Sequence, residues 1–272
     1  CAHHMRYSCF LVNSLLLMGT SLAALAAPSA APVASATSLE QAPSMDGDVL
    51  NDAAWRKTPA ITGFWQIQPN DGQAASQRTE VFIGYTEQML YVGVICYDKD
   101  PSQIIVTDSR RDSSLDETDS FQFILDGFND RQNGLIFGTN PAGLEYDAQV
   151  TKEGTSSFGF GGGEFNLNWD TSWQVETSIT AEGWQAEFAI PFKSLRYGGG
   201  KDQTWGINFQ RNIRRNNEIS FWAPLGRQYN INRVSDAGTI TDLQPPHQKS
   251  LKLTPYGVAK RNEGNTIASG TD

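Results

Sequence analysis

Histidine and cysteine are both scarce in this sequence, with three of each among 272 residues. Only Cys96 and His247 lie beyond the first nine residues, and His247 follows Pro245 and Pro246. One cysteine in the body of the chain excludes an intrachain disulfide there. One histidine argues against a multi-histidine zinc site, a Cys/His pair and a Ser-His-Asp triad.

Positive charge is also in short supply, because 21 Lys and Arg residues face 30 Asp and Glu residues, for a net charge of −9. This balance argues against a nucleic-acid partner. The glycines of residues 154–163 match no phosphate-binding fingerprint, since no helix follows them. The basic segment 211–215 is expected to lie between strands, as an ion-paired turn or, alternatively, as a phosphate site.

The N-terminal part is predicted to be processed. Residues 1–4 precede Met5 and look like upstream reading frame, and residues 5–26 have the apolar run and the A-x-A ending of a secretory signal peptide. The run is too short to span a membrane as a helix. Residues 27–38, rich in Pro, Ala and Ser, are interpreted as a linker. We therefore expect an exported protein of the periplasm or cell surface.

The rest of the chain lacks helical periodicity between residues 54 and 242 and shows the two-residue alternation of strands. Residues 89–97 are apolar on both faces, which predicts a central strand covered on both sides. The pattern predicts an all-β antiparallel sandwich over residues 39–245. The strands are expected at residues 80–85, 89–97, 121–126, 134–139, 144–150, 173–179, 184–190, 205–210 and 219–222.

Acidic residues crowd three loops, at 98–100, 112–119 and 126–130. Such hard oxygen ligands suit calcium, although the spacing matches no EF-hand loop. Alternatively, the acids are solvated and pair with Arg110, Arg111 and Arg131. A third alternative is a pair of carboxylates that performs glycoside hydrolysis, although the sequence selects no pair. The candidate calcium ligands are Asp98, Asp100, Asp126 and Asp130.

Seven tryptophans are present. Trp173, Trp184 and Trp205 belong to alternating strands and are expected in the core. Trp65 and Trp169 lie in less regular polar segments, where an exposed ring could stack on a sugar or pack inside the protein. These two are the candidate aromatic contacts of a ligand.

In their order along the chain, several segments resemble the family 9 carbohydrate-binding module. The resemblance implies an antiparallel β-sandwich that binds a poly- or oligosaccharide without cleaving it, sometimes with structural calcium. The expected site residues are Trp65 or Trp169 for stacking and Arg110, Asp119, Gln122 and Asn140 for polar contacts. The matching segments are Asp46-Gly47 with Trp55, residues 90–94 ahead of Asp98, Asp119-Ser120 before the 121–126 strand, residues 137–140 with Gly143, residues 183–192, and residues 205–209.

One departure concerns the sugar site itself. Sugar-binding members clamp a ring between two tryptophans, and the corresponding positions fall near Asp116 and Ile231 here. A family arginine is likewise replaced, by Gly138, whereas Gln122 and Asn140 remain as polar groups. The resemblance therefore predicts the fold together with an altered ligand face.

The closest variant that the sequence resembles is the domain found before an outer-membrane β-barrel in DUF5916 proteins of Gram-negative bacteria. Residues 251–256 resemble the first strand of that barrel, so residues 246–272 are expected to begin a truncated barrel domain. This implies an outer-membrane-associated protein linked to polysaccharide binding or catabolism, with its own C-terminal barrel as a partner. The alternatives are a periplasmic plug or interaction domain that binds no sugar, and a glycoside hydrolase.

Overall fold

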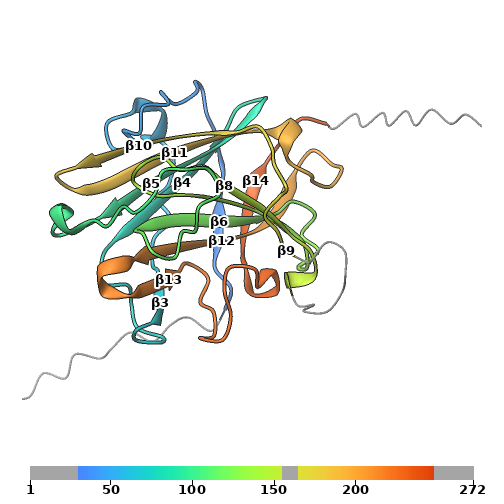
Figure 1. Ribbon diagram of the computed structural model, residues 1–272. Coiled ribbons are helices and arrows are strands. Elements are labelled where there is room, and N and C mark those ends of the chain that lie inside the picture. The colour runs from blue at the N-terminus through green and yellow to red at the C-terminus, as the bar shows by residue number, and fades with distance from the viewer. Residues whose placement is uncertain (1–29, 155–164, 248–272) are drawn as a thin grey trace, which may run out of the picture.

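The computed structural model describes residues 30–154 and 165–247 (Figure 1). The predicted signal peptide, the predicted barrel strand at 251–256 and nearly all of the glycine-rich segment 154–163 lie outside the described residues. The described chain folds into two stacked β-sheets, which confirms the predicted all-β sandwich.

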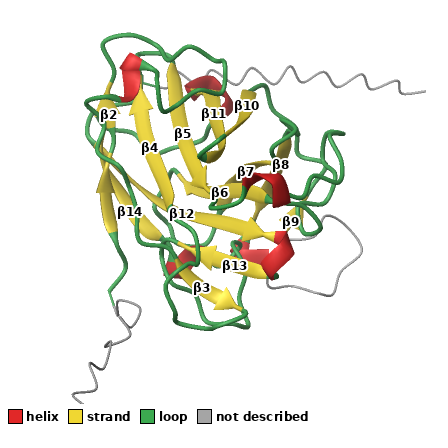
Figure 2. Cartoon of the chain, turned by 90° about the vertical axis from the view of Figure 1, so that its left-hand side faces the viewer, coloured by secondary structure: helices red, strands yellow, loops and turns green. Residues whose placement is uncertain are grey.

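The larger sheet has nine strands and the smaller has five. Figure 2 shows β5, β4 and β11 of the small sheet side by side above β12 and β6 of the large one. The small sheet runs β10 (Gln174–Thr180), β11 (Gly183–Pro191), β5 (Met89–Tyr97), β4 (Thr79–Tyr85) and β2 (Thr37–Ser38). The large sheet runs β1 (Val33–Ser35), β14 (Gly238–Leu243), β12 (Gln203–Ile213), β6 (Ser120–Asp126), β7 (Gly134–Thr139), β8 (Tyr146–Val150) and β9 (Phe165–Asn166), with β13 (Glu218–Phe221) paired to β12 and β3 (Trp65–Gln68) paired to β13.

Strand β5 is central, as its two apolar faces predict, with β4 on one side and β11 on the other. Its residues Leu90 and Val92 face the sandwich core, while Tyr91 and Ile95 belong to a separate cluster with Trp55. A Cβ added to Gly93 would lie 3.0 Å from the Trp55 ring, so the absence of a side chain lets that ring cover the strand. The strand is thus buried on both faces.

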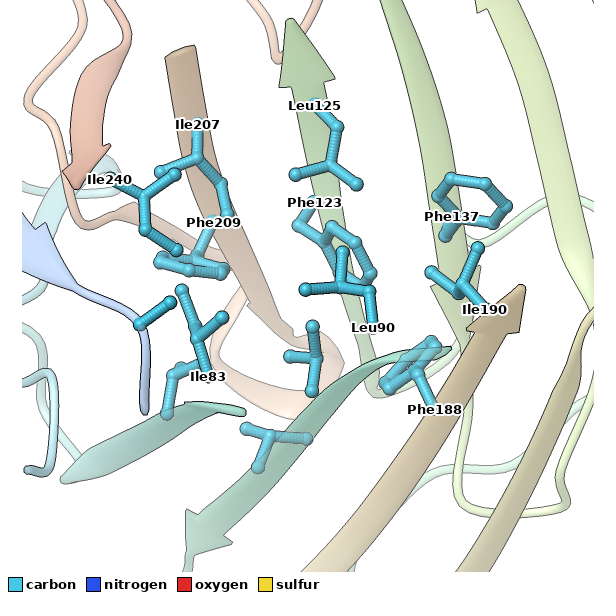
Figure 3. Close-up of a cluster of buried hydrophobic side chains, with 14 of the residues drawn as sticks. Ile83, Leu90, Phe123, Leu125, Phe137, Phe188, Ile190, Ile207, Phe209 and Ile240 are labelled. Carbon is cyan, nitrogen blue, oxygen red and sulfur yellow. The ribbon is translucent and has the colours of Figure 1, made fainter. Parts of the chain in front are cut away.

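The sandwich core is filled by aromatic and aliphatic side chains from both sheets (Figure 3). Phe123 of the large sheet and Phe188 of the small sheet meet edge to face, with centroids 5.1 Å apart. Trp173 stacks on Phe188 at 5.8 Å. Each fully buried side chain of this size contributes about 2 kcal/mol through removal of apolar surface from water. The predicted core positions of Trp173, Trp184 and Trp205 are confirmed.

The expectation of a linker over residues 27–38 is wrong for residues 33–38. Strand β1 pairs in parallel with β14 of the large sheet, and β2 pairs in parallel with β4 of the small sheet. The segment has the Ala, Ser and Pro content of a linker, but its backbone hydrogen bonds at the sheet edges hold it in place. The folded unit therefore begins earlier than predicted.

The expected position of Arg211 between strands is also wrong, because β12 continues to Ile213. Arg211 is 1% exposed, and its guanidinium donates to the carbonyl oxygens of Arg78 at 2.8 Å and Tyr97 at 2.7 Å. Because these carbonyl oxygens accept its hydrogen bonds, the guanidinium can be buried at a tolerable cost in free energy. The turn itself is confirmed as ion-paired, with Arg214 bonded to Glu117 and Arg215 to Asp98.

The described helices are all single 3-10 turns. None of them has the length and apolar character needed to cross a membrane. They are η1 (Ala53–Trp55), η2 (Pro101–Gln103), η3 (Lys152–Gly154), η4 (Phe192–Ser194), η5 (Arg214–Asn216) and η6 (Val234–Asp236).

Candidate functional site

The large sheet has a second face, directed away from the small sheet. Since side chains alternate along a strand, Phe121 and Phe123 of β6 face the core, and Gln122 and Ile124 face the other way. A cavity of about 410 Å³ lies on this second face, and we call it the groove. It is lined by Ile67, Gln68, Asp116, Gln122, Ile136, Tyr146, Phe165, Gln210, Ile219, Phe221, Tyr229, Asn230, Ile231 and Asn232.

The apolar part of the groove belongs to a hydrophobic cluster separate from the sandwich core. Ile136 and Phe221 come from the sheet, and Ile231 comes from the segment between β13 and β14. That segment also contributes Tyr229 and Asn230 to the lining. A loop folded over the sheet therefore forms one wall of the groove.

A row of amide side chains crosses the groove. Gln122 of β6 and Gln210 of β12 are register partners, so their side chains stand next to each other on the same face. Gln210 Nε2 donates to Asn212 Oδ1 at 2.8 Å, and Asn212 Nδ2 donates to the Leu115 carbonyl oxygen at 3.3 Å. Within residues 30–154 and 165–247 the Gln122 amide has no hydrogen-bond partner, although the residue is only 8% exposed. Buried amides are normally satisfied, so Gln122 has hydrogen-bonding capacity to offer a ligand.

Three aromatic residues border this row of amides. Phe165 is 38% exposed and Tyr229 is 37% exposed, and the Arg233 guanidinium carbon lies 4.5 Å from the centre of the Tyr229 ring. Burial, together with the negative charges of Asp116 and Asp112, raises the pKa of Tyr146 to about 12. The Tyr146 hydroxyl therefore remains protonated and can donate a hydrogen bond at any ordinary pH.

The structure brings together the two positions at which the family resemblance predicts a missing aromatic clamp. Asp116 and Ile231 both line the groove. Gly138, which replaces a family arginine, is closely surrounded: an added Cβ would lie 2.7 Å from Leu115 Cδ1 and 2.9 Å from Gln122 Cβ. Leu115 thus occupies the space that a larger side chain at position 138 would need.

Of the six predicted ligand contacts, only Gln122 lines the groove. Trp65 lies half-buried in β3, and Trp169 packs edge to face on the core residue Phe137, with centroids 6.2 Å apart. The Asn140 amide donates to the Asp108 carbonyl oxygen at 2.6 Å and accepts from the Ala142 N–H at 3.0 Å, so it is used within its own turn.

Of the other two predicted contacts, Arg110 forms an ion pair and Asp119 accepts a backbone hydrogen bond. Arg110 is exposed and pairs with Asp108 at 2.6 Å. Asp119 is fully buried at one end of the sandwich, where its Oδ1 accepts from the Arg214 N–H at 2.8 Å. Burial raises the pKa of Asp119, while the bond from Arg214 and the nearby positive charge of Arg211 lower it in part.

The four candidate calcium ligands lie in two separate places. Burial alone would raise the pKa of Asp98. Its bidentate ion pair with Arg215, at 2.7 Å for each oxygen, instead brings this pKa below the ordinary value. Asp126 accepts from the backbone N–H of Arg131 at 2.8 Å and of Asp130 at 3.2 Å. No described cluster of three or more His, Cys, Asp or Glu side chains is arranged to hold a metal ion. Calcium binding stays a prediction, which a chelator-dependent fall in melting temperature would support.

Of the acids in the three loops, Asp112 pairs with Arg111 as expected, at 3.7 Å. The other contacts of this guanidinium are with acids outside those loops, namely Glu145, Asp147 at 2.5 Å and Asp170 at 2.6 Å. Arg131 differs, since its guanidinium donates to the Ala237 carbonyl oxygen at 2.5 Å and to Thr239 Oγ1 at 2.9 Å. It thus ties the β6–β7 turn to β14.

The residues of the groove that sequence reasoning missed are Gln210, Tyr146, Tyr229, Asn230 and Asn232. A signal for Gln210 was present, because Gln210 and Asn212 alternate with the inward residues Phe209 and Arg211 of β12. The predicted strand 205–210 already contained Gln210, but its pairing with β6, which places this amide beside Gln122, joins segments distant in the sequence. Nothing local indicates that residues 229–232 fold over the sheet.

Comparison with known proteins places the fold. No family model matches the chain, and no curated protein matches it. A family 9 carbohydrate-binding module from Caldicellulosiruptor kristjanssonii in complex with glucose superposes with a TM-score of 0.51 and 16% identity, over 80% of this chain and 98% of that one. A protein from Bacteroides uniformis, provisionally described as carbohydrate-binding, gives a TM-score of 0.57 and 14% identity, over 78% and 99% of the two chains. The chain therefore has a β-sandwich fold like that of family 9 carbohydrate-binding modules.

Proposed function

We propose that this chain is a non-catalytic module that binds a saccharide in the groove. The observation that carries the proposal is Gln122, a mostly buried residue whose amide is open to the groove and has no partner among the described residues. Its oxygen and nitrogen can therefore accept and donate hydrogen bonds to a ligand in the groove. The sheet thus offers polar capacity that the fold itself does not use.

The remaining lining suits the two kinds of surface that a sugar presents. Sugar hydroxyls both donate and accept hydrogen bonds, and the Gln122, Asn230 and Asn232 amides do the same. The apolar faces of a sugar ring pack on aromatic rings, and the part-exposed rings of Phe165 and Tyr229 can receive them. The likeness in fold to a module that holds glucose adds support.

The number of carboxylates that line the groove agrees with a binding role without hydrolysis. Glycosidases place two carboxyl groups on either side of the bond they cleave. Asp116 is the one carboxylate among the residues that line this cavity. The groove itself therefore offers no pair of carboxyl groups, and Glu117 and Glu218 belong to an adjoining cavity.

The cellular setting is part of the proposal and is supported by the sequence. The signal-peptide pattern of residues 5–26 and the resemblance to domains that precede barrels favour an exported, outer-membrane-associated protein that takes part in polysaccharide capture. Its own barrel would then be a protein partner. The competing role, a plug or interaction domain, would use the apolar groove to contact protein instead of sugar.

The test is isothermal titration of the purified protein with glucose, cellotriose, xylotriose, mannotriose and chitotriose. We expect at least one to bind, and Gln122→Ala to weaken it about tenfold, the effect of losing hydrogen bonds worth about 1.4 kcal/mol. Gln174→Ala, which removes an exposed amide on β10, is the matched control and should leave affinity unchanged. The melting temperature should be similar in both variants, since Gln122 makes no internal bond among the described residues.

Failure of all five sugars to bind would remove the proposal. So would binding that Gln122→Ala and Gln174→Ala weaken equally, because the ligand would then lie outside the groove.

A further inference from the structure

A second, smaller cavity of about 180 Å³ adjoins the groove. Gln68, Asp116 and Ile219 line both cavities, so Asp116 stands where one passes into the other. The second cavity also contains Glu117, Arg214 and Glu218. A ligand in the groove that reaches Asp116 meets a region with three carboxylates and one guanidinium.

The charges of this region are only partly compensated. Glu117 is neutralised by Arg214, with its Oε2 accepting at 3.0 Å and 2.7 Å. Glu218 Oε1 accepts from the Ser76 N–H at 2.9 Å, and Asp116 Oδ2 accepts from Ser114 Oγ at 3.3 Å. Neither of these two carboxylates has a cationic partner in the described parts of the chain. Two negative charges are therefore left for a ligand to balance.

Independent support for a ligand at this place comes from the neighbouring amide. Gln122 is more than nine-tenths buried, faces the same groove as Asp116 and has no described hydrogen-bond partner. The charge of Asp116 also acts on the Tyr146 hydroxyl across the groove, where it helps to raise the pKa of that group. The carboxylate is thus close to the groove interior and is not directed only at bulk water.

We propose that the groove selects saccharides that carry a protonated amino group, such as a glucosamine unit, and that Asp116 receives this ammonium group. The inference rests on the proposed saccharide binding and adds the class of sugar. An ammonium group donates charge-assisted hydrogen bonds to a carboxylate, which are stronger than those of a neutral hydroxyl. The same uncompensated charge repels uronic acids, whose carboxylates would face Asp116 and Glu218.

The experiment compares three trisaccharides by titration calorimetry at low ionic strength and at a pH where the amine is protonated. They are fully deacetylated chitotriose, N-acetylated chitotriose and cellotriose. We expect the deacetylated form to bind about fivefold more tightly than the other two, the effect of a partly exposed charge pair. Added salt should reduce this preference, because it screens such a pair.

Asp116→Asn is the decisive variant, because the exposed side chain keeps its size and loses its charge. It should abolish the preference while cellotriose binding remains. Glu176→Gln removes an exposed charge on β10 of the other sheet and should preserve the preference. Circular dichroism melting of each variant confirms that the fold is retained, and the salt dependence of the unaltered protein gives a second measurement.

The outcomes separate the two proposals. If cellotriose binds and deacetylated chitotriose binds no tighter, the amino-sugar inference fails and saccharide binding stands. An equal loss of preference in Asp116→Asn and Glu176→Gln would assign the effect to the acidic protein as a whole, and would also overturn the inference. Absence of binding by all three sugars removes both.

Discussion

Polar side chains are buried at two places along β6 and β12, and the two places differ in the hydrogen bonds that those side chains make. At the end of the sandwich, Asp119 and Arg211 are enclosed and bond to the chain itself, as Arg211 does to Thr79 Oγ1 at 3.0 Å, while Asp119 Oδ2 and Arg211 Nε have no partner among the described residues. In the groove, the Gln122 side chain makes no hydrogen bond in the described chain, and its amide is open to the cavity. The comparison indicates that the first region stabilises the fold, whereas the second is open to a ligand.

The largest expected effect is on stability at the first region. Arg211→Leu should lower the free energy of unfolding by about 3–5 kcal/mol, because it leaves Asp119 buried without its compensating charge. Urea denaturation followed by tryptophan fluorescence measures this. Arg110→Leu, at an exposed arginine, should leave the unfolding curve unchanged.

Saccharide affinity should remain intact in Arg211→Leu under folding conditions. A loss of affinity larger than the unfolded fraction explains would connect the two regions and break the comparison.

An intermediate effect is expected at the aromatic wall of the groove. Tyr229→Ala should weaken saccharide binding by about fivefold, since ring stacking contributes about 1 kcal/mol. Tyr229→Phe retains the ring and should bind as the unaltered protein does. Titration calorimetry compares the two variants, with whichever sugar binds in the test of the proposed function.

If Tyr229→Phe loses as much affinity as Tyr229→Ala, the hydroxyl and not the ring makes the contact, and the stacking assignment at this wall is wrong.

The smallest expected effect concerns pH. Burial raises the pKa of Asp119 above its ordinary value of 3.8, so between the two values the folded state binds more protons than the unfolded state. The contribution of Asp119 to stability therefore falls as pH rises through this window. Asp119→Asn lacks this contribution, so across this window its unfolding free energy should fall less, or rise more, with pH than that of the unaltered protein.

Thermal or urea unfolding at several pH values from 3.8 upward tests this slope. Asp71→Asn, at an exposed acid, is the control and should keep the slope of the unaltered protein. If the unfolding free energy of Asp119→Asn instead falls more, or rises less, with pH than that of the unaltered protein, the Asp119 carboxylate is stabilised as a charge, contrary to the burial seen here.

The longer strands could be predicted from the pattern of their apolar residues. The 89–97 strand has the predicted bounds, and the 121–126 and 134–139 strands differ by at most one residue. Strands β1, β2, β3, β9 and β14 were missed because they have only two to six residues each, too few for a pattern to be distinctive. Their strand conformation depends on hydrogen bonds to neighbours far away in the sequence.

The site was harder to predict than the fold. Gln122 was chosen for its place in the family resemblance, and it does line the groove. Trp65 and Trp169 were chosen because their segments are polar, but local polarity does not report which side of a sheet a ring faces. Arg211 was assigned to a turn because a charged residue is not expected inside a buried strand. In the structure it lies within β12, and its guanidinium donates to backbone carbonyl oxygens.

The sequence by itself determined the all-β class, the central strand that is apolar on both faces, and the absence of an intrachain disulfide in the body of the chain. These follow from composition and from a two-residue period, both of which are local properties. Only the tertiary structure decided that Asp116, Gln122 and Ile231 share one groove. The reason is physical: the β13–β14 segment packs over the sheet through apolar contacts between residues distant in sequence, and these contacts alone leave the Gln122 amide facing an open cavity.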